Sequence, residues 1–455
     1  MQSLNWLTAR QAADGLGEGR FSATALAQAC LDQIAAREPE VGAWTYLDPE
    51  QVLAQARRAD EARAAGRRLG HLHGLPVGIK DIIDTADMPT ENGTSLHAGR
   101  RSQNDARLVE LLRAAGAVIM GKTVTTELAT YAPGKTRNPH DLEHTPGGSS
   151  SGSAAAVAAG MVPLALGTQT NGSVIRPASF CGVFGFKPSR GLLSCRGILR
   201  QSPSLDQPGL FARSVEDLAL LGEALMEAAP DSHVNTALLA VCAEEPPTPP
   251  RLAFVRTSLW PRADDEVRGG LEKLVARLRA HVKELPTPVI AESVLDWHKT
   301  VMEADIAANY AAEYEQSEQG EHGKAGAARL SASLRDQIER GRAIAAGDYR
   351  AALARIPEVT AALDSLFGEC DAIITPAVAG AAPRGLDSTG SPMFCTLWTF
   401  CGMPAISLPL LRAGNDLHPG LHPGLPIGVQ LVGRVGDDAR LLRTARWLTR
   451  IALQQ

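Results

Sequence analysis

Two segments rich in glycine and serine carry hydroxyl groups in settings where a nucleophile could act. Residues 147–153 read GGSSSGS, and residues 167–173 read GTQTNGS. Glycine-rich turns let consecutive backbone N–H groups converge on an anion, and a hydroxyl that faces such donors can attack a carbonyl carbon. Each segment taken alone is equally well explained by close packing of a helix on a sheet. The two segments therefore identify candidate serines without assigning a reaction.

The first segment also fits two other interpretations. Residues 148–152 match the G-x-S-x-G pattern, in which Ser150 would be the nucleophile of an α/β hydrolase. That arrangement needs a hydrophobic strand before the turn, and the preceding residues 143–146 (EHTP) make a poor strand. A phosphate-binding loop is the other interpretation, but the segment does not follow the G-x-x-x-x-G-K-[ST] pattern.

Lys80 is unusual because it lies in an apolar run, residues 76–83 (PVGIKDII), that is expected to be a strand. Lysine is rarely buried unless it is paired. One interpretation is an ion pair with Asp81 or Asp84 at the strand end. The other is a base whose pKa has been lowered by burial. The residues alone leave both interpretations open.

Taken together, these segments resemble the amidase signature family. The similarity covers residues 147–188 almost continuously and returns at 74–84 and 425–430. The combination is far more specific than any one of the motifs. The resemblance implies an enzyme that cleaves amide-type C–N bonds and needs neither a metal nor an organic cofactor.

The resemblance also assigns catalytic roles to Lys80, Ser149 and Ser173. Neutral Lys80 would withdraw a proton from Ser173 through the hydroxyl of Ser149, which a cis peptide bond precedes. Ser173 would attack the carbonyl, and protonated Lys80 would then return a proton to the leaving amine before water releases the acyl group. The backbone donors of the oxyanion hole would be Thr170, Asn171, Gly172 and Ser173.

The second segment departs from the common family pattern. Gln169 and Ile175 stand where many members have Asp and Arg, and Arg176 follows one position later. The loss of an ion pair explains the joint change, because losing only one of the two residues would leave the other as an unpaired buried charge. This variant resembles a malonamidase-like branch, in which the arginine that matches Arg176 can hold a substrate carboxylate. Similar enzymes hydrolyse anilides and carbamates (urethanes).

The substrate pocket is expected to lie between residues 128–133, a helical cover at 296–364, and residues 397–401. Candidate substrate-binding residues are Arg176, Gly148, Tyr131 and Leu128. Bulky apolar residues in the covering segments favour neutral substrates; they are Trp297, Met302, Leu397, Trp398 and Phe400.

The function expected first is hydrolysis of a small-molecule amide, anilide or carbamate. The alternatives are a hydrolase of malonamate-type acidic amides and an acyl transferase. Two further alternatives are a subunit of a glutamine-dependent amidotransferase acting on charged tRNA, with partner subunits and an ammonia tunnel, and a non-catalytic binding protein.

The alternation of expected strands and helices around these residues predicts an α/β fold. We expect a mixed, twisted central sheet flanked by helices on both sides. Strands are expected at 75–83, 117–120, 163–166, 372–375, 405–408 and 425–432. Helices are expected at 22–36, 49–66, 105–115, 154–159, 264–282 and over much of 296–364. Residues 244–251 read as a proline-rich connector and 418–424 as a loop. We expect a single domain over residues 1–455.

Composition excludes several classes of function. The 45 basic and 50 acidic residues give a net charge of −5, which argues against nucleic acid or an anionic membrane as the main partner. No stretch approaches the ~20 apolar residues that span a bilayer, and no secretory signal is visible. The seven scattered cysteines suggest reduced thiols in a cytoplasmic protein. The partner is expected to be a small molecule, and a homodimer is possible.

Overall fold

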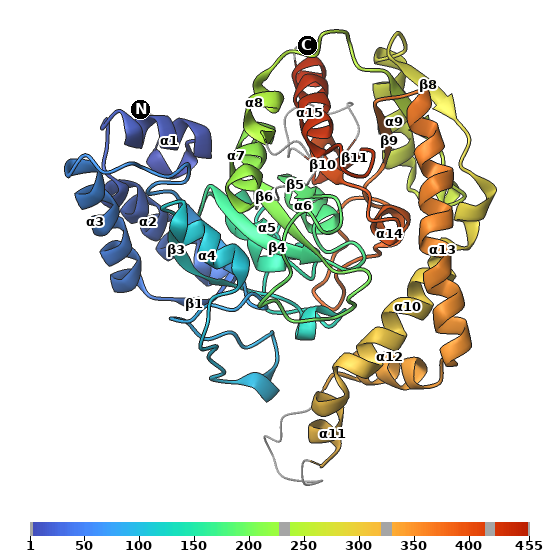
Figure 1. The fold of residues 1–455 in the computed structure, drawn as a ribbon, viewed down its shortest axis with the longest axis horizontal. Helices are drawn as coiled ribbons and strands as arrows, with labels where there is room; N and C mark the ends of the chain where they lie inside the picture. Colours follow the sequence, from blue (N-terminus) through green and yellow to red (C-terminus); the bar gives the residue numbers. More distant parts are fainter. Residues whose placement is uncertain (1–2, 227–236, 320–329, 415–423, 454–455) are drawn as a thin grey trace.

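A mixed sheet of eleven strands runs through the computed structural model, which describes residues 3–226, 237–319, 330–414 and 424–453 (Figure 1). The strand order is β1-β3-β2-β4-β6-β5-β10-β11-β9-β7-β8. The strands are β1 (Trp44–Leu47), β2 (Pro76–Lys80), β3 (Val118–Thr123), β4 (Leu164–Gln169), β5 (Phe184–Lys187), β6 (Gln207–Ala212), β7 (Leu252–Val255), β8 (Val282–Leu285), β9 (Ala372–Pro376), β10 (Ala405–Arg412) and β11 (Pro426–Val432).

Parallel and antiparallel pairs alternate in blocks across this sheet. β2 is parallel to β3 and β4, and β7 is parallel to β8 and β9. The strands from β4 through β6, β5, β10 and β11 to β9 are antiparallel to their neighbours. The expected mixed sheet is therefore confirmed.

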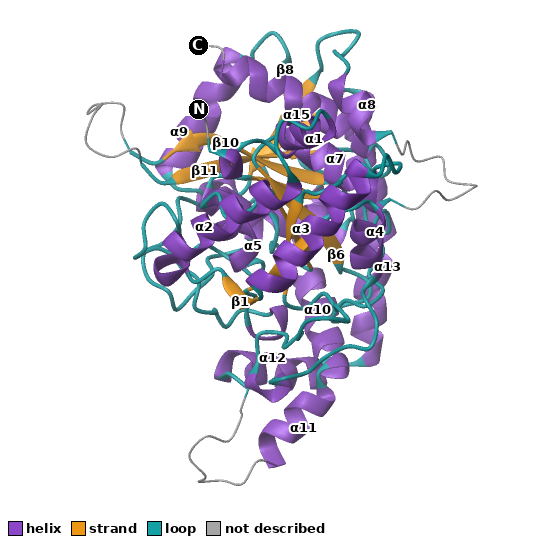
Figure 2. Cartoon of the chain, turned by 90° about the vertical axis from the view of Figure 1, so that its left-hand side faces the viewer, coloured by secondary structure: helices purple, strands orange, loops and turns teal. Residues whose placement is uncertain are grey.

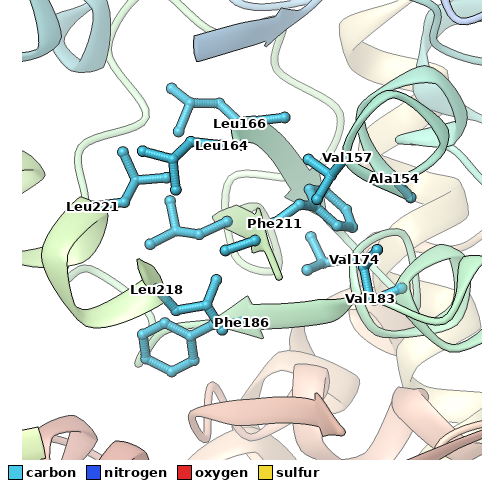
Figure 3. Close-up of a cluster of buried hydrophobic side chains, with 14 of the residues drawn as sticks. Ala154, Val157, Leu164, Leu166, Val174, Val183, Phe186, Phe211, Leu218 and Leu221 are labelled. Carbon is cyan, nitrogen blue, oxygen red and sulfur yellow. The ribbon is translucent and has the colours of Figure 1, made fainter. Parts of the chain in front are cut away.

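Helices pack on both faces of the sheet, as expected. Figure 3 shows the central strands between Ala154 and Val157 of α5 on one side and Leu218 and Leu221 of α7 on the other. The helices outside the cover are α1 (Ala9–Gly17), α2 (Ala23–Val41), α3 (Pro49–Ala64), α4 (Arg107–Ala114), α5 (Ser151–Ala158), α6 (Ile175–Cys181), α7 (Val215–Leu225), α8 (Leu238–Ala243), α9 (Asp265–Arg277), α14 (Met393–Phe400) and α15 (Asp438–Leu453).

Helix α5 is buried almost all round because its residues are small. A side chain at Gly152 would place its Cβ 2.3 Å from the carbonyl oxygen of Ala43, so only glycine fits there. The glycine- and serine-rich segment therefore serves close packing as well as any chemistry that its hydroxyls perform.

A helical layer lies to one side of the sheet (Figures 1 and 2). Its helices in the described part of the chain are α10 (Val294–Asn309), α11 (Ala311–Gln319), α12 (Ala332–Arg342) and α13 (Ala346–Asp364). Val301 and Ile306 of α10 share a buried cluster with Trp398 and Phe400 of α14. We call these four helices the cover.

Several strands were not expected from the sequence. β1, β5, β7 and β8 have only four residues each, which is too short to show a hydrophobic period. β7 directly follows the expected connector at 244–251, and β8 begins at Val282, the last residue of the helix expected at 264–282. Strand β3 was expected to close at Gly121 but continues to Thr123, because the glycine lets the carbonyl of Tyr46 approach closely.

Residues 116–123 (GAVIMGKT) match the phosphate-loop pattern, but residues 118–123 of this segment form strand β3 instead of a loop. Lys122 is fully buried, and its Nζ donates to the carbonyl of Ile83 and to Thr90 Oγ1. This match is therefore structural. The expected loop at 418–424 falls mostly outside the described residues. Across the described ranges, we find no helix with the length and apolar character of a membrane span.

Candidate active site

Lys80 ends strand β2, and its side chain is completely buried. Its Nζ lies 2.8 Å from Ser149 Oγ and 2.8 Å from Thr168 Oγ1. Within the described chain no carboxylate forms an ion pair with Lys80, and Asp84 instead pairs with Arg100. The ion-pair interpretation is therefore wrong. Burial lowers the pKa of Lys80 well below its ordinary value, as a base requires.

The loop before α5 carries Ser149 and Ser150 in different environments. The peptide bond between Gly148 and Ser149 is cis, as the resemblance implied. Ser149 faces the lysine, whereas Ser150 is fully buried and bonds to both the N–H and the carbonyl of Thr168 at 3.2 Å. Because the Ser150 hydroxyl joins the loop to β4, the elbow interpretation with Ser150 as the nucleophile is wrong.

The turn between β4 and α6 is shaped by Gln169. Its Oε1 accepts from the N–H groups of Val174 at 2.8 Å and Ile175 at 3.0 Å, and its Nε2 donates to Thr399 Oγ1 at 2.9 Å. A neutral amide thus satisfies the first donors of α6 where a charged side chain was expected in relatives. No ion pair is needed at this place.

Ser173 lies in that turn, two residues before the start of α6, with 9% of its surface exposed. Its hydroxyl makes no hydrogen bond to Ser149 or to any other described residue, so the structure joins Lys80 to Ser149 but not Ser149 to Ser173. Catalytic hydrogen bonds are often long before a substrate binds. None of the four N–H groups expected as oxyanion donors, those of Thr170, Asn171, Gly172 and Ser173, has an acceptor among the described residues, and the last three follow one another in the turn after β4. Unpaired N–H groups in such a buried turn are rare, and they suit an oxyanion.

Thr170 and Asp206 connect this turn to the start of β6. Thr170 Oγ1 donates to Asp206 Oδ1 at 2.6 Å, and the N–H groups of Gln201 and Ser202 reach Asp206 Oδ2 at 2.9 Å. Burial raises the pKa of Asp206 to about 6. Its negative charge acts in the opposite sense to burial on Lys80 and raises the lysine pKa. Sequence reasoning missed Asp206, because one carboxylate before a strand carries no motif.

Arg176 is buried with only part of its guanidinium satisfied. Nη2 donates to the carbonyl of Gly148 at 2.6 Å and to Thr389 Oγ1 at 3.1 Å. Nε and Nη1 are buried without a partner, and no carboxylate in the described chain pairs with this side chain. Burial lowers the arginine pKa. A buried cation without a counter-charge is costly, so the free edge of Arg176 suits an anionic group.

Two cavities flank the turn. One of about 540 Å³ is lined by Thr168, Thr170 and Asp206 together with apolar residues such as Ala129. The other, of about 400 Å³, lies on the Asn171 side and is lined by Tyr131, Met302, Glu303 and Arg340 among others. Tyr131 OH accepts from Asn171 Nδ2 at 3.3 Å.

Some residues expected in the pocket lie in the core instead. Leu128 is fully buried, and its neighbour Ala129 lines the cavity. Trp398 and Phe400 are also buried in the core, and the ring of Trp297 packs under Arg355. These aromatic residues therefore give less support to a neutral substrate than the sequence suggested. No group of three potential metal-ligating side chains occurs in the part of the chain described.

Comparisons with known proteins agree over nearly the whole chain. The family model described as Amidase matches residues 25–442. A glutamyl-tRNA(Gln) amidotransferase subunit of Chloroflexus aggregans is 34% identical, over 97% of this chain and 96% of that protein.

Solved structures are similar over the same extent. One of these structures is described as a vestigial protein complex that reveals the evolutionary origins of an s-triazine catabolic enzyme. Its matching chain superposes on this one with a TM-score of 0.87, at 27% identity and 98% coverage of both chains. The 6-aminohexanoate cyclic dimer hydrolase complexed with substrate gives 0.83 at 26% identity, over 99% of this chain and 98% of that one.

Proposed function

This chain belongs to the amidase family of enzymes that act on C–N bonds, and we propose that it hydrolyses an amide-type bond of a small molecule through an acyl-enzyme on Ser173. Neutral Lys80 takes the proton of Ser149 as Ser149 takes that of Ser173. The Ser173 oxygen then bonds to the substrate carbonyl carbon. The oxyanion accepts hydrogen bonds from the free N–H groups of the turn.

The second half of the reaction reverses the proton path. Protonated Lys80 returns a proton through Ser149 to the leaving nitrogen, and the C–N bond breaks. Water then attacks the acyl-serine, giving its proton to the same relay, and Ser173 recovers its hydrogen as the carboxylic acid leaves. A lysine whose pKa is lowered can be neutral at the start of each cycle and charged in the middle.

The observation that carries this proposal is the turn with three successive unpaired N–H groups beside a buried lysine–serine pair. The test is a fluorophosphonate probe followed by peptide mass analysis. Labelling of the wild-type enzyme at Ser173, with loss of both labelling and 4-nitroacetanilide hydrolysis in Ser173→Ala, is the expected result. Labelling at Ser149 or Ser150, or full activity of Ser173→Ala, would overturn the assignment.

Arg176 favours a more specific substrate class, an amide with a carboxylate on its acyl side. Its Nε and Nη1 lack a partner although the side chain is 1% exposed and lines neither cavity, so we propose that substrate binding opens the packing around Gly148 and that these two atoms then donate to a carboxylate. Malonanilic acid and acetanilide form a matched pair that differs by this carboxylate. Arg176→Gln should lower kcat/KM for the acid by about 10–150-fold, the equivalent of 1.5–3 kcal/mol, and spare acetanilide. An equal loss on both substrates would assign Arg176 a structural role.

A second candidate is a subunit of a tRNA-dependent amidotransferase, which the name of the C. aggregans relative favours. The acidic net charge and the residues Gln169 and Ile175 favour a hydrolase that acts by itself. Measuring the release of ammonia from glutamine distinguishes these two candidate functions. An amidotransferase subunit should release ammonia only with its partner subunits and leave anilides intact, whereas the proposed hydrolase should cleave anilides as a purified monomer or homodimer.

The seven cysteines support the expected cytoplasmic location, since all of them are free thiols in the structure. Fractionation of the native cells, with an antibody against this chain, measures the location directly. We expect the chain in the cytosolic fraction. Recovery of most of it from the membrane or from outside the cell would contradict this expectation.

A further inference from the structure

The three N–H groups proposed as oxyanion donors lie on three consecutive peptide planes, and each plane is held at its carbonyl end. In a trans peptide the carbonyl of one residue and the N–H of the next point in opposite directions within one rigid plane. A hydrogen bond to the carbonyl therefore fixes the direction of the N–H group at the other end.

The holding groups come from three different elements. The carbonyl of Gly172 accepts from the backbone N–H of Arg176 in α6 at 3.0 Å. The carbonyl of Asn171 accepts from Thr399 Oγ1 of α14 at 2.5 Å. The carbonyl of Thr170 lies 2.9 Å from Nε2 of His298, which belongs to α10 of the cover. These bonds direct the N–H groups of Ser173, Gly172 and Asn171 respectively.

His298 is suited to this contact as a neutral donor. A carbonyl can only accept, so the partner geometry requires the hydrogen on Nε2. The ring is 1% exposed and lies against Phe400, with centroids 6.5 Å apart. Burial also lowers the pKa of His298 to about 4. The imidazole therefore remains an uncharged Nε2–H donor at neutral pH and adds no cation beside the oxyanion.

We propose that His298 is a positioning residue for the oxyanion hole, acting through the Thr170–Asn171 peptide plane. This inference rests on the proposed function, since it needs Asn171 N–H to receive the oxyanion. The other end of Thr170 is fixed as well, because its hydroxyl is bound by Asp206. Rotation of the Thr170–Asn171 peptide would break the bond between the Thr170 carbonyl and His298, so this bond opposes a change in the direction of the Asn171 N–H. The cover thus takes part in catalysis by aiming a donor that it does not itself supply.

A matched pair of variants tests this role. His298→Met keeps a side chain of similar length without a donor, and His298→Gln places an amide N–H near the position of Nε2. Misplacing a catalytic group by about 1 Å can cost roughly 100-fold in rate. We expect Met to lower kcat for 4-nitroacetanilide by about 10–100-fold with KM within about threefold, and Gln to restore most of that loss.

The fluorophosphonate labelling rate should fall in parallel, because the phosphonyl oxygen uses the same donors. Tyr314→Phe is the control in the cover, since it removes a hydroxyl bond to Glu339 that lies away from the site. If His298→Met does not fold, His298→Asn replaces it as the variant too short to reach Thr170.

The outcomes separate this inference from the proposed function. Wild-type labelling at Ser173 with an unchanged kcat in His298→Met would overturn the positioning role alone. A loss that Gln does not rescue, accompanied by an equal fall of the melting temperature in Met and Gln, would show a structural role and also overturn it. Activity that survives in Ser173→Ala would overturn the proposed function, and this inference with it.

Discussion

At the scale of the residue, the site depends on a lysine whose contacts are hydroxyls instead of carboxylates. Lys80 was recognisable in the sequence because a cation in an apolar run is rare, and Ser149 and Ser173 because their motif is specific. Asp206 and His298 were not recognisable, and Thr399 was expected only as part of the 397–401 segment near the pocket, not as a partner of this turn. Each reaches the turn from a distant segment, and a lone Asp, His or Thr gives no local signal of its partner.

Lys80→Arg tests whether the lysine acts as a base. Arginine keeps the positive charge and hydrogen-bond donors, but it cannot lose its proton in a protein. We expect turnover of 4-nitroacetanilide to fall by at least about 100-fold, within the range typical of general base catalysis. The folded state is checked by circular dichroism. A folded Lys80→Arg enzyme with more than about a tenth of wild-type activity would contradict the assignment.

Asp206→Asn tests how charge sets the pH at which the lysine works. The wild-type rate should rise with pH as Lys80 loses its proton. The Asp206 carboxylate raises the lysine pKa, so its removal should lower that pKa further and leave the base neutral in more acidic solution. The acid limb of kcat/KM against pH should therefore move to lower pH. A shift to higher pH would refute the coupling between the two groups.

At the scale of the element, the side chain of Gln169, the last residue of β4, caps the start of helix α6 where a charged residue was expected in relatives. Its amide oxygen accepts from two backbone donors, so removing it leaves both unpaired in the core. Gln169→Leu should lower the free energy of unfolding by about 1–3 kcal/mol, which is the cost of leaving buried polar groups without a hydrogen-bond partner. Urea unfolding measures this. Gln169→Glu is the informative control, since it keeps the acceptor and loses the donation to Thr399. A Leu variant as stable as the wild type would show that water satisfies those donors.

The elements themselves were only partly predictable. Long periodic segments such as α3 and α13 and β-branched runs such as β9 and β11 follow from the sequence. β5 and β6 were missed because glycine and proline interrupt them (FGFK and QPGLFA), and tertiary pairing overrides local preference there. The turn between β4 and α6 depends on side chains of other elements, so its shape could not be read from its own residues.

At the scale of the whole molecule, one sheet includes strands from β1 to β11. The single domain expected for residues 1–455 remains a prediction, and this continuity supports it. Calorimetry should give one heat-absorption peak, because separating the halves would break the sheet between β5 and β10. Two resolved peaks, or a fragment ending before residue 372 that melts cooperatively, would contradict a single unit.

The place of the last strands also matters for how the chain is made. β10 and β11 occupy the middle of the sheet, between β5 and β9, although they leave the ribosome after every other strand. Until they arrive, β5 and β9 each present an unpaired edge, which is a template for aggregation. β5 must wait for a partner more than two hundred residues away, since Phe186 pairs with Ile406. Such non-local pairing is slow to form. From the synthesis of β5 until that of β10 and β11, the middle of the sheet therefore lacks two strands. The yield of the protein in cells should depend on chaperones that protect the exposed edges of β5 and β9.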